Sequence, residues 1–248
     1  MSQKKRKQNW LEEANNVELE KTISWRDERD KSADEQKESA NSNKLKPKTK
    51  NQETYMNSVY SKTVTICSGV AGTGKTYIAC GIAAEMLIDL KIEKIIIARP
   101  LVECGQRLGA FPGDLKEKTE PFMTAMLEVF GKFMTKTKMR KIKTDEVLEI
   151  CPLEIMRGRT FHNSVIILDE AQNATRRQLK MFLTRFGQES KVIICGDHTQ
   201  TDLPHSEGNT MNWLLDRLDH NDIGKVFLTS EDVQRHGLIK YIIEQLGE

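Results

Sequence analysis

The sequence predicts an α/β fold in which a mostly parallel sheet carries helices on both faces. Short runs of consecutive apolar residues alternate with longer helical patterns from about residue 51 onward. Strands that are apolar at successive positions are typical of a parallel sheet covered on both sides. The expected strands are residues 63–67, 94–98, 164–168, 191–195 and 225–228. The expected helices are residues 75–90, 121–133, 175–185 and 209–218.

The N-terminal part of the chain differs in composition from the rest. Lys, Glu, Asn, Gln and Ser dominate residues 1–50, and apolar side chains are scattered. Such a segment cannot bury enough apolar surface to offset the entropy that it loses on ordering. We therefore expect a disordered polar tail or partner-dependent helix over 1–50, and a folded domain over 51–248. The basic residues 4–7 either contact phosphate groups or are simply solvated.

Bulk charge and cysteine content exclude some function classes. The chain has 38 basic and 36 acidic side chains, so its net charge is only +2 and nucleic-acid binding requires a local basic patch. The five cysteines show no zinc-ligand spacing, which favours a reducing compartment. No stretch approaches the ~18 apolar residues of a membrane span, and no apolar run follows the basic start. We expect a soluble, cytoplasmic protein without a membrane partner.

The clearest local signal is a glycine-rich loop between a predicted strand and a predicted helix. Residues 69–76 read GVAGTGKT. Glycines let successive backbone N–H groups face inward as an anion nest, and the helix N-terminus adds partial positive charge. In such a loop Lys75 reaches the β- and γ-phosphates of ATP, and the Thr76 hydroxyl binds Mg²⁺. The residues expected to contact the nucleotide are Gly69, Val70, Ala71, Gly72, Thr73, Gly74, Lys75, Thr76 and Tyr77.

Two acidic residues follow the predicted strand 164–168. Asp169 and Glu170 would lie at the carboxyl edge of the sheet, where ligands bind in such folds. We expect Asp169 to hold Mg²⁺, and Glu170 to orient or deprotonate the attacking water. A strand followed by an acidic helix start would give the same pattern. The phosphate loop in the same sheet favours the catalytic interpretation.

A third polar group, GDHTQ at residues 196–200, follows the next predicted strand. Gln200 would sense the γ-phosphate or the attacking water, and Asp197 would support it. An ordinary turn rich in Gly and Asp is the alternative. Hydrolysis also requires a cation that neutralises charge in the transition state, worth ~10³–10⁵ in rate. The candidates are Arg157, Arg159, Arg185 and Arg235, and spacing does not choose among them.

Together with four further segments, these motifs resemble the PhoH family of ATPases. The segments are ARPLVECGQRLGAFPGDLKEK at 98–118, MRGRTFHNSVIILDEAQNAT at 156–175, LTRFGQESKVIICGDHTQTDLP at 183–204 and SEDVQRH at 230–236. The resemblance runs in order over about residues 50–245. The family is similar to the core of superfamily 1 RNA and DNA helicases, which implies a single RecA-like P-loop NTPase domain. Short versions resemble phage-encoded and stand-alone bacterial proteins, so the host cytoplasm is implied if a phage encodes this chain.

The resemblance also implies catalytic roles. It assigns Asp169 and Glu170 as the Mg²⁺ and water pair, and Gln200 as the sensor. Family members are similar to ring-forming ATPases, which implies a homo-oligomer in the form of a hexameric ring. Arg235 would then be an arginine finger that acts in a neighbouring subunit's site.

Helicase analogy implies contacts with the base and with a polymer. Gln52 would read the adenine edge, and Tyr55 would stack near it. Arg99, Pro100 and the loop 105–113 would face single-stranded RNA or DNA.

Three function classes remain open. An ATP-driven nucleic-acid motor, such as an RNA or DNA helicase, would need a second core, which must come from another subunit. An ATP-dependent switch or assembly factor would hydrolyse ATP without translocation. A small-molecule kinase is disfavoured because Glu170 suits water activation and no Arg-rich lid segment is apparent.

Overall fold

A six-stranded parallel sheet forms the centre of the domain. The computed structural model describes residues 44–100, 115–204, 206–234 and 237. The strands lie in the order β3-β2-β4-β5-β1-β6, and every neighbouring pair is parallel. Their bounds are β1 Val64–Gly69, β2 Lys94–Arg99, β3 Leu148–Pro152, β4 Ser164–Leu168, β5 Lys191–Gly196 and β6 Ile223–Leu228. Because all strands run the same way, the segments that follow them gather at one edge of the sheet.

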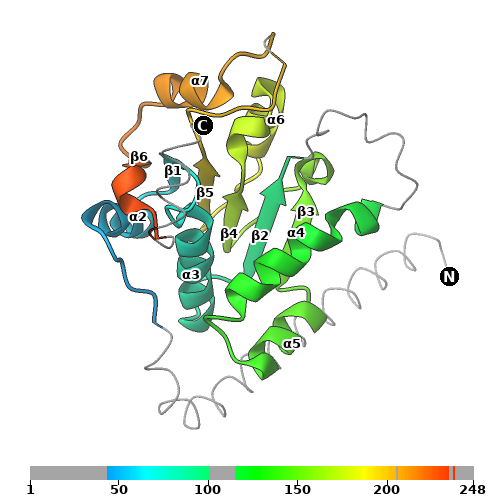
Figure 1. Cartoon of the computed structure of the whole chain (residues 1–248). Coiled ribbons are helices and arrows are strands. Elements are labelled where there is room, and N and C mark those ends of the chain that lie inside the picture. Colours follow the sequence, from blue (N-terminus) through cyan, green and yellow to red (C-terminus); the bar gives the residue numbers. More distant parts are fainter. Residues whose placement is uncertain (1–43, 101–114, 205, 235–236, 238–248) are drawn as a thin grey trace, which may run out of the picture. The chain divides into compact units, whose positions relative to one another are not determined.

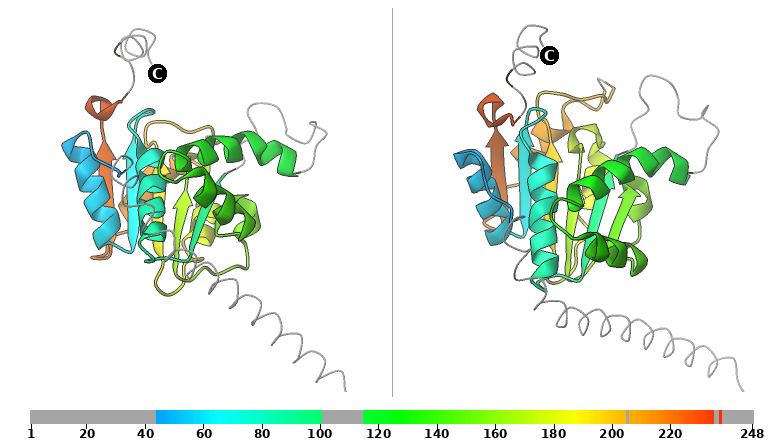
Figure 2. Two further views of the ribbon diagram at one scale, coloured as in Figure 1. Left: turned by 90° about the horizontal axis from the view of Figure 1, so that it is seen from below. Right: turned by 60° about the horizontal axis from the view of Figure 1, so that its bottom comes forward.

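Helices cover both faces of the sheet (Figures 1 and 2). On one side lie α3 and α4, with α2 towards the β6 end and α5 beside β3. On the other side lie α6 and α7. The bounds are α2 Lys50–Ser61, α3 Lys75–Ile88, α4 Leu115–Phe130, α5 Lys136–Thr144, α6 Arg176–Phe182 and α7 Thr210–Arg217. Short 3₁₀ turns are η2 Leu153–Met156, η3 Ala171–Asn173 and η4 Ser230–Asp232.

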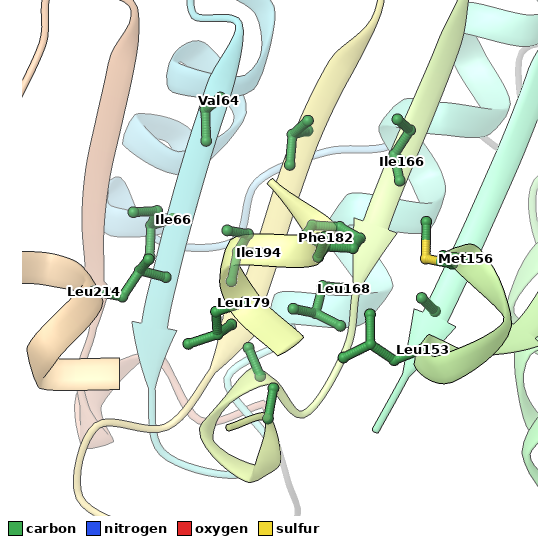
Figure 3. Packing of buried hydrophobic residues seen from close by; sticks show 14 of the residues in the cluster. Val64, Ile66, Leu153, Met156, Ile166, Leu168, Leu179, Phe182, Ile194 and Leu214 are labelled. Carbon is green, nitrogen blue, oxygen red and sulfur yellow. The ribbon is translucent and has the colours of Figure 1, made fainter. Parts of the chain in front are cut away.

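A hydrophobic core cluster fills the space between the sheet and α6, α7 and η2. Alternate residues of β1, β4 and β5 point into it, and Phe182, Leu179 and Leu214 cover them (Figure 3). The intervening residues of the same strands are buried beneath α2 and α3 on the opposite face. Strands buried on both faces explain the uninterrupted apolar runs in the sequence.

The structure confirms the predicted strands and shows elements that the sequence did not predict. The unpredicted elements are α2, α5 and β3. In addition, α4 begins at Leu115, several residues before the predicted start at 121. The compact unit begins at Leu45, slightly before the predicted boundary at residue 51. Leu45 is buried, and its backbone N–H donates to Glu85 Oε1 (3.0 Å), which joins this residue to α3. Among the described residues, no helix combines the length and apolarity that a membrane crossing requires.

Candidate functional site

The glycine-rich loop connects the end of β1 to the start of α3, as predicted. Gly72 (φ 83°) and Gly74 (φ 87°) adopt left-handed backbone conformations, which L side chains rarely adopt. The helix starts at Lys75, so its first unpaired backbone N–H groups point towards the loop. A loop of this shape at a helix N-terminus is suited to bind a phosphate group.

The ammonium group of Lys75 lies over this loop. It donates hydrogen bonds to the backbone carbonyl oxygens of Gly69 and Val70, the latter at 3.0 Å. The Thr73 hydroxyl donates to the same Val70 carbonyl at 2.9 Å. These three hydrogen bonds hold the loop in a tight turn around the Lys75 ammonium group.

Two side chains of α2 pack against the loop, and the adenine contact expected of Gln52 stays a prediction. Gln52 is only 3% exposed; its Nε2 donates to the Thr73 carbonyl at 3.0 Å, and its Oε1 accepts from the Lys48 backbone at 2.8 Å. Tyr55 is fully buried, and its hydroxyl lies 3.4 Å from the Lys75 carbonyl and 3.3 Å from Cys195 Sγ. A fully covered ring has no face for a base, so the expectation that Tyr55 stacks near adenine is wrong for this structure.

The two predicted metal-binding residues lie in direct contact. The Thr76 hydroxyl donates to Asp169 Oδ1 at 2.5 Å. Asp169 is 5% exposed, and burial raises its pKa above the ordinary value, although the Thr76 hydrogen bond partly offsets this. A buried carboxylate beside a hydroxyl at the phosphate loop has the oxygen ligands that suit Mg²⁺, with phosphate oxygens completing the set. The residues present therefore fit the metal that the loop implies.

Glu170 follows directly and is held in place from two sides. Its backbone adopts a left-handed conformation (φ 51°), which turns the chain sharply into η3. Its Oε2 accepts a 2.6 Å hydrogen bond from Gln172 Nε2, and its Oε1 lies 3.9 Å from the Arg99 guanidinium. A fixed carboxylate next to a phosphate loop is placed to accept a proton from a water molecule.

Gln172 connects this carboxylate to the loop that follows β5. Its Oε1 accepts from the backbone N–H of Asp197 at 3.1 Å. Its backbone carbonyl accepts from the hydroxyls of Thr201 and Thr210, each at 3.2 Å. Gln172 is 5% exposed, so these contacts are shielded from water. Sequence reasoning missed this role, because its partners lie far away along the chain.

In the described part of the chain, no hydrogen bond joins Gln200, in the loop after β5, to Asp169 or Glu170. Gln200 is exposed, whereas Asp197 is only 3% exposed. Asp197 Oδ1 accepts from the backbone N–H and hydroxyl of Thr199, at 2.9 and 2.6 Å, while Oδ2 has no partner among the described residues. The predicted sensor role of Gln200 stays a prediction, and in this structure Gln172 is the amide that contacts Glu170.

The PhoH-like protein family matches residues 44–246 of this sequence. The chain belongs to this family. A PhoH-like protein of Mycobacterium tuberculosis strain H37Rv is 42% identical over 201 residues, which cover 81% of this chain and 57% of the relative. Protein PhoH of Escherichia coli K12 is 40% identical over 187 residues, which cover 74% of this chain and 53% of the relative. The chain thus spans less than two thirds of the length of these relatives.

A solved structure supports the fold of this PhoH-like chain. The large terminase of a thermophilic bacteriophage has a TM-score of 0.53 at 12% identity, covering 82% of this chain and 51% of that one. This likeness shows the fold alone. With the phosphate loop and the sheet order, it identifies a RecA-like P-loop NTPase domain with helices on both faces.

The segment after β6 packs against the phosphate loop of the PhoH-like domain. The backbone N–H of Gln234 donates to the Gly72 carbonyl at 3.1 Å. Asp232 is 1% exposed and accepts hydrogen bonds from Thr49, Asn51 and Thr229. Burial acts to raise the pKa of Asp232, but these hydrogen bonds outweigh it and hold the pKa below the ordinary value. The predicted arginine finger, Arg235, lies outside the described residues.

The remaining predicted positions lie at the margin of the site. Tyr77, in the first turn of α3, is 39% exposed, and its ring packs on Phe133 with centroids 5.0 Å apart. Arg99 lies at the end of β2 beside Glu170, and the loop 105–113 is outside the described residues. Two of the other arginine candidates have structural contacts: Arg159 forms a two-fold ion pair with Glu149, and Arg185 donates to the Arg159 carbonyl at 3.2 Å.

Proposed function

We propose that this PhoH-like chain binds ATP with Mg²⁺ and hydrolyses it. The observation that carries the proposal is the Thr76–Asp169 contact of 2.5 Å at the mouth of the phosphate loop, with Glu170 next in sequence. A phosphate cradle alone would also suit transfer to another acceptor. A fixed carboxylate beside the metal-binding pair favours water as the acceptor.

Each residue of the site has a defined task in this reaction. The backbone N–H groups of the loop and the Lys75 ammonium bind and orient the phosphates. Thr76 and Asp169 would hold Mg²⁺, which when bound neutralises charge on the phosphate oxygens. Glu170 accepts a proton as the water oxygen bonds to the γ-phosphorus and the bond to the bridging oxygen breaks. Gln172 and Arg99 orient the Glu170 carboxylate.

The proposal extends to a nucleic-acid-dependent ATPase of the helicase-like type. The resemblance of the family to helicase cores supports it, as do Thr199 and Gln200, two polar residues that follow β5 and are exposed. The test is ATP turnover by the full chain, with and without single-stranded RNA and DNA. We expect one polymer to raise turnover several-fold and the stimulation to fall as salt screens the phosphate contacts. If neither polymer changes turnover, the chain is an ATP-dependent switch or assembly factor instead.

The proposal also includes a homo-oligomeric, hexameric ring in which Arg235 completes a neighbour's site. The resemblance of the family to ring-forming ATPases supports it, and a motor of this type would take its second core from another copy. Mixtures of wild type and Arg235→Ala should lose more activity than the mutant fraction alone explains. A fall in activity that is linear in the mutant fraction would contradict a finger acting between subunits.

A further inference from the structure

A basic surface lies on α5 and the turn before it. Residues 129–144 contain six Lys or Arg side chains and no Asp or Glu, in a chain whose net charge is only +2. Lys132, Arg140 and Lys143 are exposed. We call these three residues the α5 basic surface. The acidic residues that flank this stretch are the exposed Glu128, four positions before Lys132, and Asp145 and Glu146, which follow the helix.

Buried apolar residues fix this surface to the domain. Ile142 is 1% exposed, and Phe133 and Met134 are 8% and 5% exposed. A short turn joins the helix to β3, and the carbonyl of Val147, directly before β3, accepts from the backbone N–H of Ile95 in the neighbouring β2 at 2.8 Å. The positive charges therefore stand on an anchored element and keep their spacing when an anion binds.

The charges in the first turn of α5 oppose the stability of the helix, whereas Lys141 and Lys143 in its last turn suit the helix dipole. Lys136 and Lys138 occupy its first turn, which contains no acidic residue, although the helix dipole disfavours cations there. Arg140 and Lys143 are three positions apart, so their like charges lie on neighbouring turns and repel by roughly 0.2–0.5 kcal/mol. A bound polyanion would relieve the repulsion between Arg140 and Lys143.

An exposed aromatic ring lies at the end of the surface nearest the nucleotide site. The Lys132 ammonium stands 5.5 Å from the centre of the Tyr77 ring, and Tyr77 directly follows Thr76. Tyr77 is 39% exposed, so part of its ring is open to a flat partner. Cations beside an accessible aromatic ring are typical of proteins that bind single-stranded nucleic acid, where phosphates pair with the cations and bases stack.

We propose that the α5 basic surface binds the phosphodiester backbone of single-stranded RNA or DNA, and that Tyr77 marks the end nearest the ATP site. This inference rests on the proposed nucleic-acid dependence and adds the place where the polymer docks. An acidic protein would also match the charges, but a single strand offers both phosphates for the cations and flat bases for the ring. The combination of charge and ring therefore favours a polynucleotide.

The test compares two double variants of the full chain that remove the same charges at the same spacing. Arg140→Gln/Lys143→Gln removes part of the α5 basic surface. Arg177→Gln/Lys180→Gln removes an exposed Arg and Lys, also three positions apart, from α6. Binding of fluorescent single-stranded RNA and DNA is measured over a several-fold range of salt concentration, with helical content and polymer-free ATP turnover as controls.

The α5 variant should bind the preferred polymer about 20-fold more weakly at about 0.1 M salt. The slope of log affinity against log salt should become less steep by about 1.4, because each of the two lost contacts with a single strand contributes about 0.7. The α6 variant should bind like wild type, and both should keep polymer-free turnover. Equal losses in both variants, or no loss in the α5 variant, would overturn the proposal while leaving nucleic-acid dependence intact.

Two further results separate the possible failures. If wild type binds neither polymer, the proposed nucleic-acid dependence fails, and this inference fails with it. Poly-glutamate serves as a competitor of matched charge. If it displaces RNA and DNA as effectively per charge as unlabelled polynucleotide, the surface recognises acidic chains in general and the assignment to nucleic acid is wrong.

Discussion

Gln172 and Glu170 are joined by a 2.6 Å hydrogen bond from the amide nitrogen to a carboxylate oxygen, at the carboxyl edge of the sheet. The same amide accepts from the Asp197 backbone at 3.1 Å, so it links the end of β4 to the end of β5. A movement of either loop would therefore change the position of the proposed catalytic carboxylate.

Replacement of Gln172 should lower ATP turnover without a matching loss of ATP binding. Gln172→Ala removes a hydrogen bond from the half-buried Glu170 and leaves the N–H of the buried Asp197 without its partner, which costs about 1–3 kcal/mol. If that cost falls on the transition state, kcat drops about 5- to 150-fold while KM changes little. Steady-state kinetics measure both constants.

The charge variant Gln172→Glu sharpens this test. It keeps the size of the side chain but places a second carboxylate against Glu170, which raises the pKa of the pair. The acid limb of the rate–pH profile should therefore move to higher pH. An unchanged pH profile with wild-type kcat in both variants would show that Gln172 does not position Glu170.

Asp169→Asn should separate stability from function. Burial raises the pKa of Asp169 in the folded protein, so the stability of the fold falls as the pH rises from the ordinary carboxyl pKa through the raised value. The neutral variant should melt at the same temperature as wild type or higher without nucleotide, because Asn can still accept from Thr76. Its Mg²⁺ requirement in ATP turnover should rise roughly ten-fold or more, or ~1.4 kcal/mol. A lower melting temperature with an unchanged Mg²⁺ requirement would mean that Asp169 is structural.

Asp232→Asn should destabilise the domain in a pH-dependent way. Hydrogen bonds to the ionised carboxylate lower its folded-state pKa, so the stability it adds is present above the unfolded pKa and is lost as the pH falls towards the folded value. The variant should unfold about 1–3 kcal/mol more easily at neutral pH. Urea unfolding at neutral pH and below about pH 4, near the ordinary carboxyl pKa, measures the difference, with the exposed Asp216→Asn as control. A difference that stays constant with pH would contradict the role of the carboxylate charge.

Sequence alone predicted the parts of the fold that are fully buried or strictly spaced. Strands β1, β2, β4, β5 and β6 appear as apolar runs, and the phosphate loop fixes where Lys75 and Thr76 stand. The edge strand β3 was missed because Glu149 and Ile150 are only half-buried, which hides its strand pattern. Helix α2 was missed because its buried stripe is Gln52, Tyr55 and Val59, and a buried Gln does not register as apolar.

The candidate site was predicted less completely than the fold. Asp169 and Glu170 were found because they directly follow a buried strand. Gln172 was missed, since its importance depends on Asp197 and on threonines that approach it only in the folded chain. Tyr55 was assigned to adenine by analogy, whereas a ring with no exposed surface supports the loop instead. The partners of polar residues such as Gln172 therefore cannot be predicted until the fold is known.

The most direct test of the central proposal is ATP binding and turnover by Glu170→Gln. The variant keeps the size of the side chain and removes the base that accepts the proton. ATP affinity, measured by fluorescence with a nucleotide analogue, should stay within about two-fold of wild type, while kcat should fall about 10²–10⁴-fold. Wild-type turnover in this variant would show that the site formed by the phosphate loop, Asp169 and Glu170 does not hydrolyse ATP in the way proposed.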